Sequence, residues 1–541
     1  MLDGAHDNMN IKISKQKKRA IFLGAIVALQ VIGVVIFNQQ GSVIRAFQPY
    51  YAKSWIDSVF ARDFGNLDES LLASVGEVQG VSFVRNNSDS SENDSKFAKG
   101  IPVLVYHGVV NEPSTDGINI SYERFKEQME SLKEAGYTAI SLEEFDHFMK
   151  GEQTLQKKSV LITFDDGRRD SYYPTDSLFA TLNFHATIFV ITNRLDSNFH
   201  LNEKELKKMS DSGRWDVQSH GHLDHDFITI GENGEQGHFM SNLMWIPKDS
   251  RNENDEEMKI RLNFDLISSK NNIDEITNKQ VYAYAFPFGD YGKDSISFSD
   301  ASDLVIPIAT NQFRYSFFQV ENAYEDFFNY PEDVSKTKLV KRFKPLETWT
   351  GSDLVNVLEQ SMPKNLDYED SFSKGDLGWV SVLGEKQIVE DQLFLKASEN
   401  TSGSELYLGG TKHWKNYVFQ AQITEPTTAF VGLVAGYVDE NNYYVCSYGE
   451  NSVQLSEISN GERKSLAFSK ATTTPDIAIR FYGGKVGCYV GEDEILMRTV
   501  GEKTGGIGIK IWEEQIGNAQ TYIDNIFVKN CKEVEKCYPN R

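Results

Sequence analysis

The spacing of apolar runs changes abruptly along this chain. From Ile101 onward, short apolar runs such as PVLVY (102–106) alternate with amphipathic stretches. From about Asp367, short runs of alternating polarity follow one another with only Gly, Asn, Asp or Glu turns between them. Strand–helix–strand repetition favours parallel strands in a barrel or an open sheet, whereas evenly spaced strands favour a β-sandwich or jelly roll. The sequence therefore predicts an α/β domain over 99–362 and an all-β domain over 367–530.

Six apolar runs of the first domain have the length and flanks of buried strands. They are PVLVY (102–106), VLITF (160–164), ATIFVI (186–191), WDVQ (215–218), VYAYAF (281–286) and LVIPIAT (304–310). Helices are predicted between them over 121–136, over 141–149, where Ser141 and Glu144 form a capping box, and over 256–276. This order of elements predicts parallel strands joined by crossover helices.

Length and charge exclude several classes of protein. Single hydrophobic cores stop growing beyond roughly 250–300 residues, so a chain of 541 residues needs at least two folded units. The chain has 55 Lys and Arg against 78 Asp and Glu, and this formal charge of −23 argues against a nucleic-acid binder. A hydrophobic content of 40% excludes a disordered chain, and four Cys exclude a dense disulfide framework.

An apolar segment near the start of the chain predicts a membrane anchor. Ala20–Phe37 has Gln30 as its only strongly polar residue, and at about 1.5 Å per residue it just spans a hydrocarbon layer of about 30 Å. Lys and Arg precede the segment and neutral residues follow it, so the C-terminal domains are expected outside the cytoplasmic membrane. A cleaved signal peptide is the alternative, although no A-x-A site follows the segment. The predicted parts are a cytoplasmic tail (1–19), an anchor (20–38), a stalk or linker (39–98), the two domains, and a tail (531–541).

Four polar clusters share one position, directly after a predicted strand of the first domain. They are His107, the pair Asp165 and Asp166, the group His220, His222 and His225, and the segment PFGD (287–290). In parallel α/β folds, functional sites gather at the carboxyl ends of the strands. The shared position of the four clusters therefore predicts one common site.

The residue types in these clusters suit hydrolysis that depends on a metal. Two imidazoles and one carboxylate hold a catalytic divalent ion and leave room for water. Zinc bound in this way lowers the pKa of its water to about 7 and polarises a carbonyl oxygen. The second carboxylate can act as general base on that water, and a protonated His can deliver a proton to the departing group. Asp-Asp-Gly is also a common turn, so the three closely spaced His are the stronger indication of a metal site.

These residues resemble the signature of a known family. TFDDG (163–167) matches the first motif of the polysaccharide deacetylases (carbohydrate esterase family four, the NodB-homology domain). SHGHLDH (219–225) is similar to their second motif and FPFGDYG (286–292) to their third. The opening VLVYHGV (103–109) resembles the branch that deacetylates poly-N-acetylglucosamine exopolysaccharides. The resemblance covers roughly residues 99–362, about half of the chain.

The resemblance implies a distorted (β/α) barrel that removes acetyl groups from sugars with the help of a divalent metal, usually zinc. The general base would be Asp165. The metal ligands would be Asp166, His220 and His225. His222 is a less favoured ligand, and Pro287 together with the backbone N–H near Phe288 would form the oxyanion site.

Three departures from the family pattern bear on this mechanism. Asp224 stands where the second ligand His is commoner, and the spacing that uses His225 resembles the exopolysaccharide branch. Ala285 stands where many members have an Arg that orients the base. Three roles are open for Arg342: it replaces that Arg and orients the base, it contacts the substrate, or it is a surface cation without a role in the site. No Leu-x-His motif supplies the usual catalytic acid, so His107 is the best candidate for that role.

The second domain resembles concanavalin-like and laminin-G-like jelly rolls, which often bind glycans. Aromatic residues that could stack on sugar rings are Trp379, Trp414, Tyr443, Tyr444 and Trp512. Cys446 with Cys488 and Cys531 with Cys537 are possible disulfides, but four Cys allow three connectivities.

Three hypotheses about function follow. The leading one is an anchored hydrolase that removes N-acetyl groups from a polysaccharide of the poly-N-acetylglucosamine type, with the β-domain holding the glycan. The second is a glycan-binding surface protein whose deacetylase-like domain is weakly active or inactive, because the motif Arg and the late His are missing. The third keeps the enzyme but changes the substrate to peptidoglycan or an O-acetylated glycan. The expected partners are an acetylated polysaccharide and the cell membrane, and not nucleic acid.

Overall fold

The computed structural model describes residues 96–320, 327–373, 375, 378–424 and 429–531. The predicted cytoplasmic tail, the membrane anchor and nearly all of the stalk or linker lie outside these residues. Within the described part of the chain, no helix is both long enough and apolar enough to cross a membrane.

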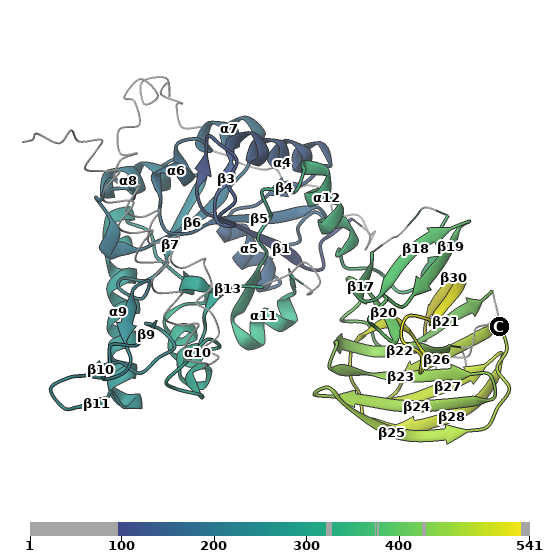
Figure 1. The fold of residues 1–541 in the computed structure, drawn as a ribbon. Helices are drawn as coiled ribbons and strands as arrows, with labels where there is room; N and C mark the ends of the chain where they lie inside the picture. The colour runs from purple at the N-terminus through teal and green to yellow at the C-terminus, as the bar shows by residue number, and fades with distance from the viewer. Residues whose placement is uncertain (1–95, 321–326, 374, 376–377, 425–428, 532–541) are drawn as a thin grey trace, which may run out of the picture. The chain divides into compact units, whose positions relative to one another are not determined.

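Seven parallel strands form a closed barrel in the first domain (Figure 1). In order around the barrel they are β1 (Ile101–Tyr106), β5 (Ser159–Phe164), β6 (Ala186–Val190), β7 (Trp215–Ser219), β12 (Ala283–Ala285), β13 (Tyr315–Gln319) and β15 (Leu339–Arg342). The last strand returns to the first, because the N–H of Phe343 donates to the Val103 carbonyl over 2.8 Å and the N–H of Val105 donates to the Phe343 carbonyl over 2.9 Å. The predicted α/β domain is confirmed as a barrel rather than an open sheet.

Short strands extend this framework. The antiparallel strand β14 (Phe328–Asn329) pairs with β1, and the parallel strand β4 (Thr138–Ala139) pairs with β5. Three further pairs stand apart from the barrel: β2 (Val109–Val110) with β3 (Ile120–Ser121), β8 (Phe227–Thr229) with β9 (Gln236–His238), and β10 (Trp245–Ile246) with β11 (Arg251–Asn252). The last two hairpins lie in the segment between β7 and the next helix, α9.

Helices fill the connections between the barrel strands. They are α4 (Tyr122–Glu134), α5 (Leu142–Met149), α6 (Arg169–Tyr172), α7 (Asp176–Leu182), α8 (Glu203–Asp211), α9 (Asp255–Thr277), α10 (Ala301–Gln312), α11 (Pro331–Thr337) and α12 (Gly351–Gln360), with the 3-10 turns η2 (Thr192–Arg194) and η3 (Pro287–Gly289). The predicted capping box is present, because Ser141 accepts the N–H of Glu144 and the Glu144 carboxylate accepts the N–H of Ser141.

One predicted strand is wrong. Residues 304–310 form part of helix α10, in which Leu304, Val305, Ile308 and Ala309 are buried on one face. A short apolar run fits either element, and here the four-residue spacing of the buried side chains is that of a helix.

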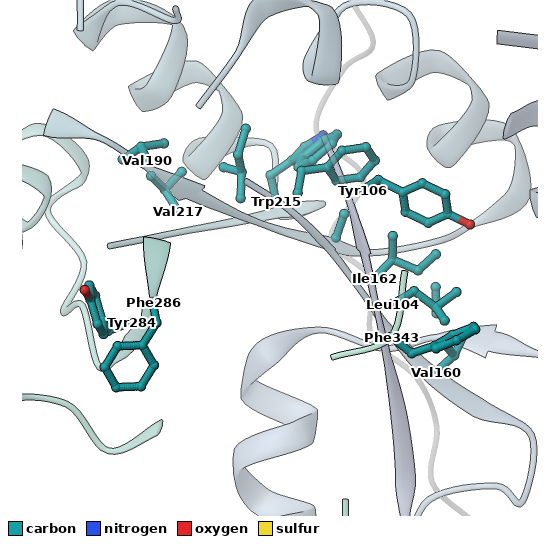
Figure 2. Close-up of a cluster of buried hydrophobic side chains, with 14 of the residues drawn as sticks. Leu104, Tyr106, Val160, Ile162, Val190, Trp215, Val217, Tyr284, Phe286 and Phe343 are labelled. Atoms are coloured by element: carbon teal, nitrogen blue, oxygen red, sulfur yellow. The ribbon is translucent and has the colours of Figure 1, made fainter. Parts of the chain in front are cut away.

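Two apolar layers support the barrel. The interior holds fully buried side chains, such as those of Val103, Leu161, Phe189, Phe317 and Val340. The outer layer packs the strands against the surrounding helices. Figure 2 shows labelled members of that layer: Leu104, Tyr106, Val160, Ile162, Val190, Trp215, Val217, Tyr284, Phe286 and Phe343. Because both faces of the strands are buried, their sequences read as continuous apolar runs.

The second domain consists of two antiparallel sheets. One sheet has the order β18 (Glu385–Val389), β19 (Gln392–Lys396), β30 (Gln520–Asn530), β21 (Tyr417–Ile423), β26 (Asp476–Tyr482), β27 (Lys485–Val490) and β28 (Asp493–Thr499), with β16 (Tyr368–Asp370) beside β30. The other has the order β17 (Trp379–Leu383), β20 (Gly403–Leu408), β29 (Gly506–Trp512), β22 (Phe430–Asp439), β23 (Asn442–Gly449), β24 (Ser452–Ser459) and β25 (Glu462–Ser469). Inward side chains from both sheets form one core, so the predicted all-β domain is confirmed.

A disulfide joins the two sheets of this domain. Cys446 in β23 is bonded to Cys488 in β27, as one of the predicted pairings has it. Cys537, the predicted partner of Cys531, lies outside the described residues.

Candidate active site

The predicted site residues converge on one end of the barrel. His107 follows β1, Asp165 and Asp166 follow β5, and His220 follows β7. Arg342 is the last residue of β15. The carboxyl ends of parallel barrel strands meet at the same rim, which explains why residues far apart in the sequence lie together.

Three side chains form a group suited to a metal ion. The Oδ1 atom of Asp166 lies 3.3 Å from the Nε2 atom of His225 and 3.6 Å from the Nε2 atom of His220. One ligand atom from each residue lies within 4.8 Å of the others. The Oδ1 atom of Asp166 is buried and has no hydrogen-bond partner. A buried oxygen without a partner, facing two imidazole nitrogens, fits a divalent ion of the zinc type.

The backbone of β12 holds the first of these imidazoles. His220 donates from Nδ1 to the carbonyl of Ala285 over 2.7 Å, which leaves Nε2 facing Asp166. Burial lowers the pKa of His220 to about 4. The imidazole is therefore neutral at physiological pH, which is the form that binds a metal.

The backbone after β5 adopts an unusual conformation at the ligand position. Asp166 has a φ of 70° and Gly167 a φ of 69°, both in the left-handed region. Non-glycine residues rarely adopt this conformation, and where they do they cluster at functional sites. The left-handed conformation of Asp166 therefore favours a functional role for this turn over that of an ordinary Asp-Gly turn.

A buried acidic pair supports the loop that carries the two His ligands. Asp224 accepts a hydrogen bond from the Tyr284 hydroxyl over 2.6 Å, and burial together with the charge of Asp265 raises the pKa of Asp224 well above its usual range. Asp265 on α9 accepts the backbone N–H of His222 over 2.9 Å. The Nδ1 atom of His222 lies 2.9 Å from the Thr192 hydroxyl, and His222 is not part of the metal-suited group.

Arg342 holds the predicted base. Its Nη2 donates to the Oδ2 atom of Asp165 over 2.7 Å, and its Nη1 donates to Oδ1 over 2.5 Å. Burial raises the pKa of Asp165, but the charge of Arg342 and its hydrogen bonds to the carboxylate outweigh burial and lower that pKa below its usual value. Arg342 is 1% exposed, so it is not a surface cation, and its guanidinium faces the base rather than a substrate surface.

His107 lies beside both carboxylates. Its Nδ1 atom is buried and has no hydrogen-bond partner, and its carbonyl accepts the Ser171 hydroxyl over 2.9 Å. Burial lowers the pKa of His107, while the charges of Asp166 and Asp165 act in the opposite direction. A buried imidazole next to two carboxylates can take up and release a proton within the site.

The turn η3 places an aromatic ring against a candidate metal ligand, His225. Pro287 is buried, and Phe288 has a φ of 60°, a second left-handed non-glycine residue at this rim. The Phe288 ring lies 4.5 Å from the His225 ring. Two further rings lie against Phe288: His238 is stacked on it at 4.5 Å with an interplanar angle of 13°, and Phe227 lies 5.6 Å away.

Sequence reasoning missed His238 as a site residue. It lies in hairpin β8–β9, which carries no motif, and its Nδ1 atom is 2.7 Å from the Oδ2 atom of Asp290. Asp290 belongs to the PFGD segment, but nothing in the sequence indicates which distant residue pairs with it.

The aromatic candidates of the β-domain fare differently. Trp379 and Trp414 are 1% and 5% exposed and belong to the core, so of the two roles open to aromatic residues in such strands, packing in the core is the one they have. Tyr443 and Tyr444 are also buried. Trp512 is half-buried and stacks on the exposed ring of Phe430 at 5.5 Å.

Comparisons with known proteins agree with this geometry. Residues 152–304 match the family model described as polysaccharide deacetylase. The Bacillus subtilis protein named "Putative polysaccharide deacetylase YxkH" is 23% identical over 238 residues, which is 43% of this chain and 73% of that protein. A poly-beta-1,6-N-acetyl-D-glucosamine N-deacetylase of Staphylococcus epidermidis is 34% identical over 109 residues, 19% of this chain and 37% of that enzyme. The chain thus spans well under half the length of this second relative.

A solved structure of a de-N-acetylase from Aggregatibacter actinomycetemcomitans is 22% identical in sequence. It aligns with a TM-score of 0.41 over 48% of this chain and 99% of that one. The family model covers the strand ends that carry Asp165, Asp166, His220, His225 and Phe288. The chain therefore contains a domain of the polysaccharide deacetylase family, a family of hydrolases.

Proposed function

We propose that this domain removes N-acetyl groups from a polysaccharide of the poly-N-acetylglucosamine type, with a divalent metal ion, most simply zinc, as cofactor. The observation that carries the proposal is the group of Asp166, His220 and His225 beside the buried pair of Asp165 and Arg342. Two imidazoles and one carboxylate are the donor set of hydrolytic zinc sites.

The roles of the residues follow from their contacts. Asp166, His220 and His225 would hold a divalent ion, which would supply Lewis-acid polarisation of the acetyl carbonyl and lower the pKa of a water molecule. Asp165, kept ionised by Arg342, accepts the proton of the attacking water. The backbone near Phe288 donates toward the oxygen on which negative charge develops. His107 returns a proton to the departing amine, which completes the hydrolysis of the amide to acetate and a free amino group.

The names of the relatives support the choice of substrate. Several staphylococcal proteins that match this chain are named as poly-beta-1,6-N-acetyl-D-glucosamine N-deacetylases. The same donor set would also hydrolyse acetyl groups on peptidoglycan or on an O-acetylated glycan, which remain the competing substrates. The apolar segment Ala20–Phe37 supports an extracytoplasmic location at the cell membrane, with the two domains outside.

The substrate is tested by measuring acetate released by the zinc-loaded full chain from three polymers. These are a partially N-acetylated β-1,6-linked glucosamine polymer, peptidoglycan and an O-acetylated glycan. We expect the first to be hydrolysed fastest. Faster release from another polymer would move the assignment to that polymer, and release that never exceeds that of Asp165→Asn would contradict a deacetylase function.

A second candidate function, glycan binding by the β-domain, is supported by one observation. Phe430 is 38% exposed and stacked on Trp512, whose ring also lies 5.4 Å from the Arg463 guanidinium. Exposed aromatic rings of this kind can stack on sugar rings. If this surface holds glycan, Phe430→Ala weakens binding of the full chain to the N-acetylated polymer. Phe468→Ala, which removes another exposed ring (60% exposed), serves as the matched control.

A further inference from the structure

The β8–β9 hairpin brings a further histidine ring to the rim of the barrel. His238, at the end of β9, is 9% exposed, and its ring stacks on Phe288 at 4.5 Å and 13°. Phe288 also lies 4.5 Å from His225, with an interplanar angle of 48°. The Phe288 ring therefore contacts both His238 and a candidate metal ligand.

Asp290 fixes the orientation of this histidine. The Oδ2 atom of Asp290 lies 2.7 Å from the Nδ1 atom of His238 and accepts the Ser241 hydroxyl over 2.5 Å. Its Oδ1 atom accepts the backbone N–H of Gly292 over 2.9 Å and that of Asp294 over 3.2 Å. A fully buried carboxylate with four such contacts is held rigidly, and a ring bonded to it cannot turn freely.

Although His238, Asp290 and Asp294 together have the composition of a metal site, the contacts favour another role. Both carboxylate oxygens of Asp290 already accept hydrogen bonds. This differs from Asp166, whose Oδ1 atom has none. The geometry fits a carboxylate that orients a histidine better than one that binds an ion.

The hairpin itself is anchored to the long helix α9. Arg261 donates from Nη1 to the Phe239 carbonyl over 2.6 Å and from Nη2 to the Asn242 carbonyl over 3.0 Å. The same guanidinium pairs with the buried carboxylate of Glu253. The position of His238 is therefore set by the helix as well as by Asp290.

We propose that His238 is a positioning residue for the deacetylation reaction: held by Asp290, it keeps Phe288 in its left-handed turn and thereby fixes the His225 ring. Phe288 has a φ of 60°, which is strained for a residue with a side chain, so packing must hold it there. The Phe288 ring packs against the His225 ring and limits its rotation. A histidine ligand that can rotate binds a metal less tightly. The proposal rests on the proposed function for its effect on turnover, but not for its effect on metal binding.

The test compares His238→Ala and His238→Phe with the wild-type full chain. Loss of the stacked ring is expected to lower kcat and zinc affinity by about 10–100-fold each, with KM changed less than about 3-fold. His238→Phe keeps a flat ring against Phe288 and is expected to recover most of both losses. Zinc affinity is measured by competition with a chelator, with His225→Ala as the reference for a lost ligand. Gln236→Ala, an exposed change in the same hairpin, is expected to leave both values unchanged.

Two results would overturn the proposal. One is a His238→Ala protein whose kcat and zinc affinity stay within about 2-fold of wild type. The other is a His238→Phe protein that is folded, by thermal unfolding, yet as impaired as His238→Ala in zinc affinity. If the wild type releases no acetate from any polymer, the proposed function fails, and the zinc affinities of the same variants still decide the role of His238.

Discussion

The proposed base of the site, Asp165, is oriented by a residue from the last strand of the barrel. Arg342 pairs with Asp165 across 177 positions of sequence, and the closed barrel makes this possible because β15 lies next to β1. Ala285, at the position where an Arg was expected, contributes its carbonyl to His220 instead. Arg342 thus takes the place of the Arg that many members of the family have at the position of Ala285. This removes one of the two reasons for the hypothesis of a weakly active or inactive domain.

Removing this arginine is expected to destabilise the protein. Arg342→Met leaves the Asp165 carboxylate buried without its cation, a change that costs about 3–5 kcal/mol of unfolding free energy. The double variant Asp165→Leu/Arg342→Met is expected to recover most of that loss, since replacing both partners by apolar groups is often neutral. Chemical denaturation of the three proteins measures both effects. Equal stability of Arg342→Met and the wild type would contradict the buried pair.

Gly221 is expected to be required by the ligand loop. It has a φ of 78°, and a Cβ there would lie 1.7 Å from the Oδ1 atom of Asp224. Gly213 has a similar φ of 72° with open space around it, so Gly213→Ala should cost only the conformational penalty of about 1–2 kcal/mol. Gly221→Ala should cost clearly more and should also weaken zinc binding. Equal midpoints of denaturation for the two variants would contradict this role of the loop.

At the residue scale, the sequence allowed us to predict the site residues that lie in motifs, but not those that reach the site through contacts between distant parts of the chain. Asp165, Asp166, His220 and His225 follow strands and are recognisable by type and spacing. The environment of His238 is different, because its importance depends on a ring stack with a residue 50 positions away. Local pattern carries no information about such a contact.

At the scale of elements, sequence patterns identified the strands that are apolar throughout. β1, β5 and β6 fall where continuous apolar runs predicted them. β13 and β15 were missed, because Ser316, Gln319, Lys341 and Arg342 interrupt their apolar pattern. The side chain of Arg342 points to the site and pairs with Asp165. A charged residue required at the site therefore interrupts the apolar pattern by which the strand would have been recognised.

The disulfide between β23 and β27 is expected to stabilise the β-domain. It closes a loop with a sequence separation of 42, for which chain entropy gives about 4 kcal/mol, and measured values usually fall at 2–4 kcal/mol. Cys446→Ala/Cys488→Ala should therefore unfold at lower denaturant concentration. Acetate release should stay unchanged, because both residues lie outside the barrel. A fall in acetate release under conditions where both domains remain folded would contradict this separation.

At the scale of the whole molecule, the net charge of −23 bears on the product of the proposed reaction more than on its proposed substrate. An N-acetylated glucosamine polymer is neutral, whereas removal of acetyl groups leaves amines that are cationic at neutral pH. An acidic protein attracts such a product through long-range electrostatics, which salt screens with a Debye length of about 8 Å at 0.15 M.

Affinity for the deacetylated polymer is therefore expected to fall with added salt. We expect binding of the full chain to fully deacetylated polymer to weaken several-fold between 0.02 M and 0.3 M sodium chloride, roughly as the screening of surface charges requires. Binding of the N-acetylated polymer should change little over the same range. Product affinity that does not respond to salt would contradict retention by charge.

The most direct test of the account is acetate release from a partially N-acetylated β-1,6-linked glucosamine polymer by the zinc-loaded full chain and by its Asp165→Asn variant. Asp165→Asn removes the base while leaving the candidate ligands Asp166, His220 and His225 in place. The account predicts release by the wild type, its loss on chelation and its return with zinc, and no release by the variant above a metal-free control. Robust release by Asp165→Asn would contradict the mechanism.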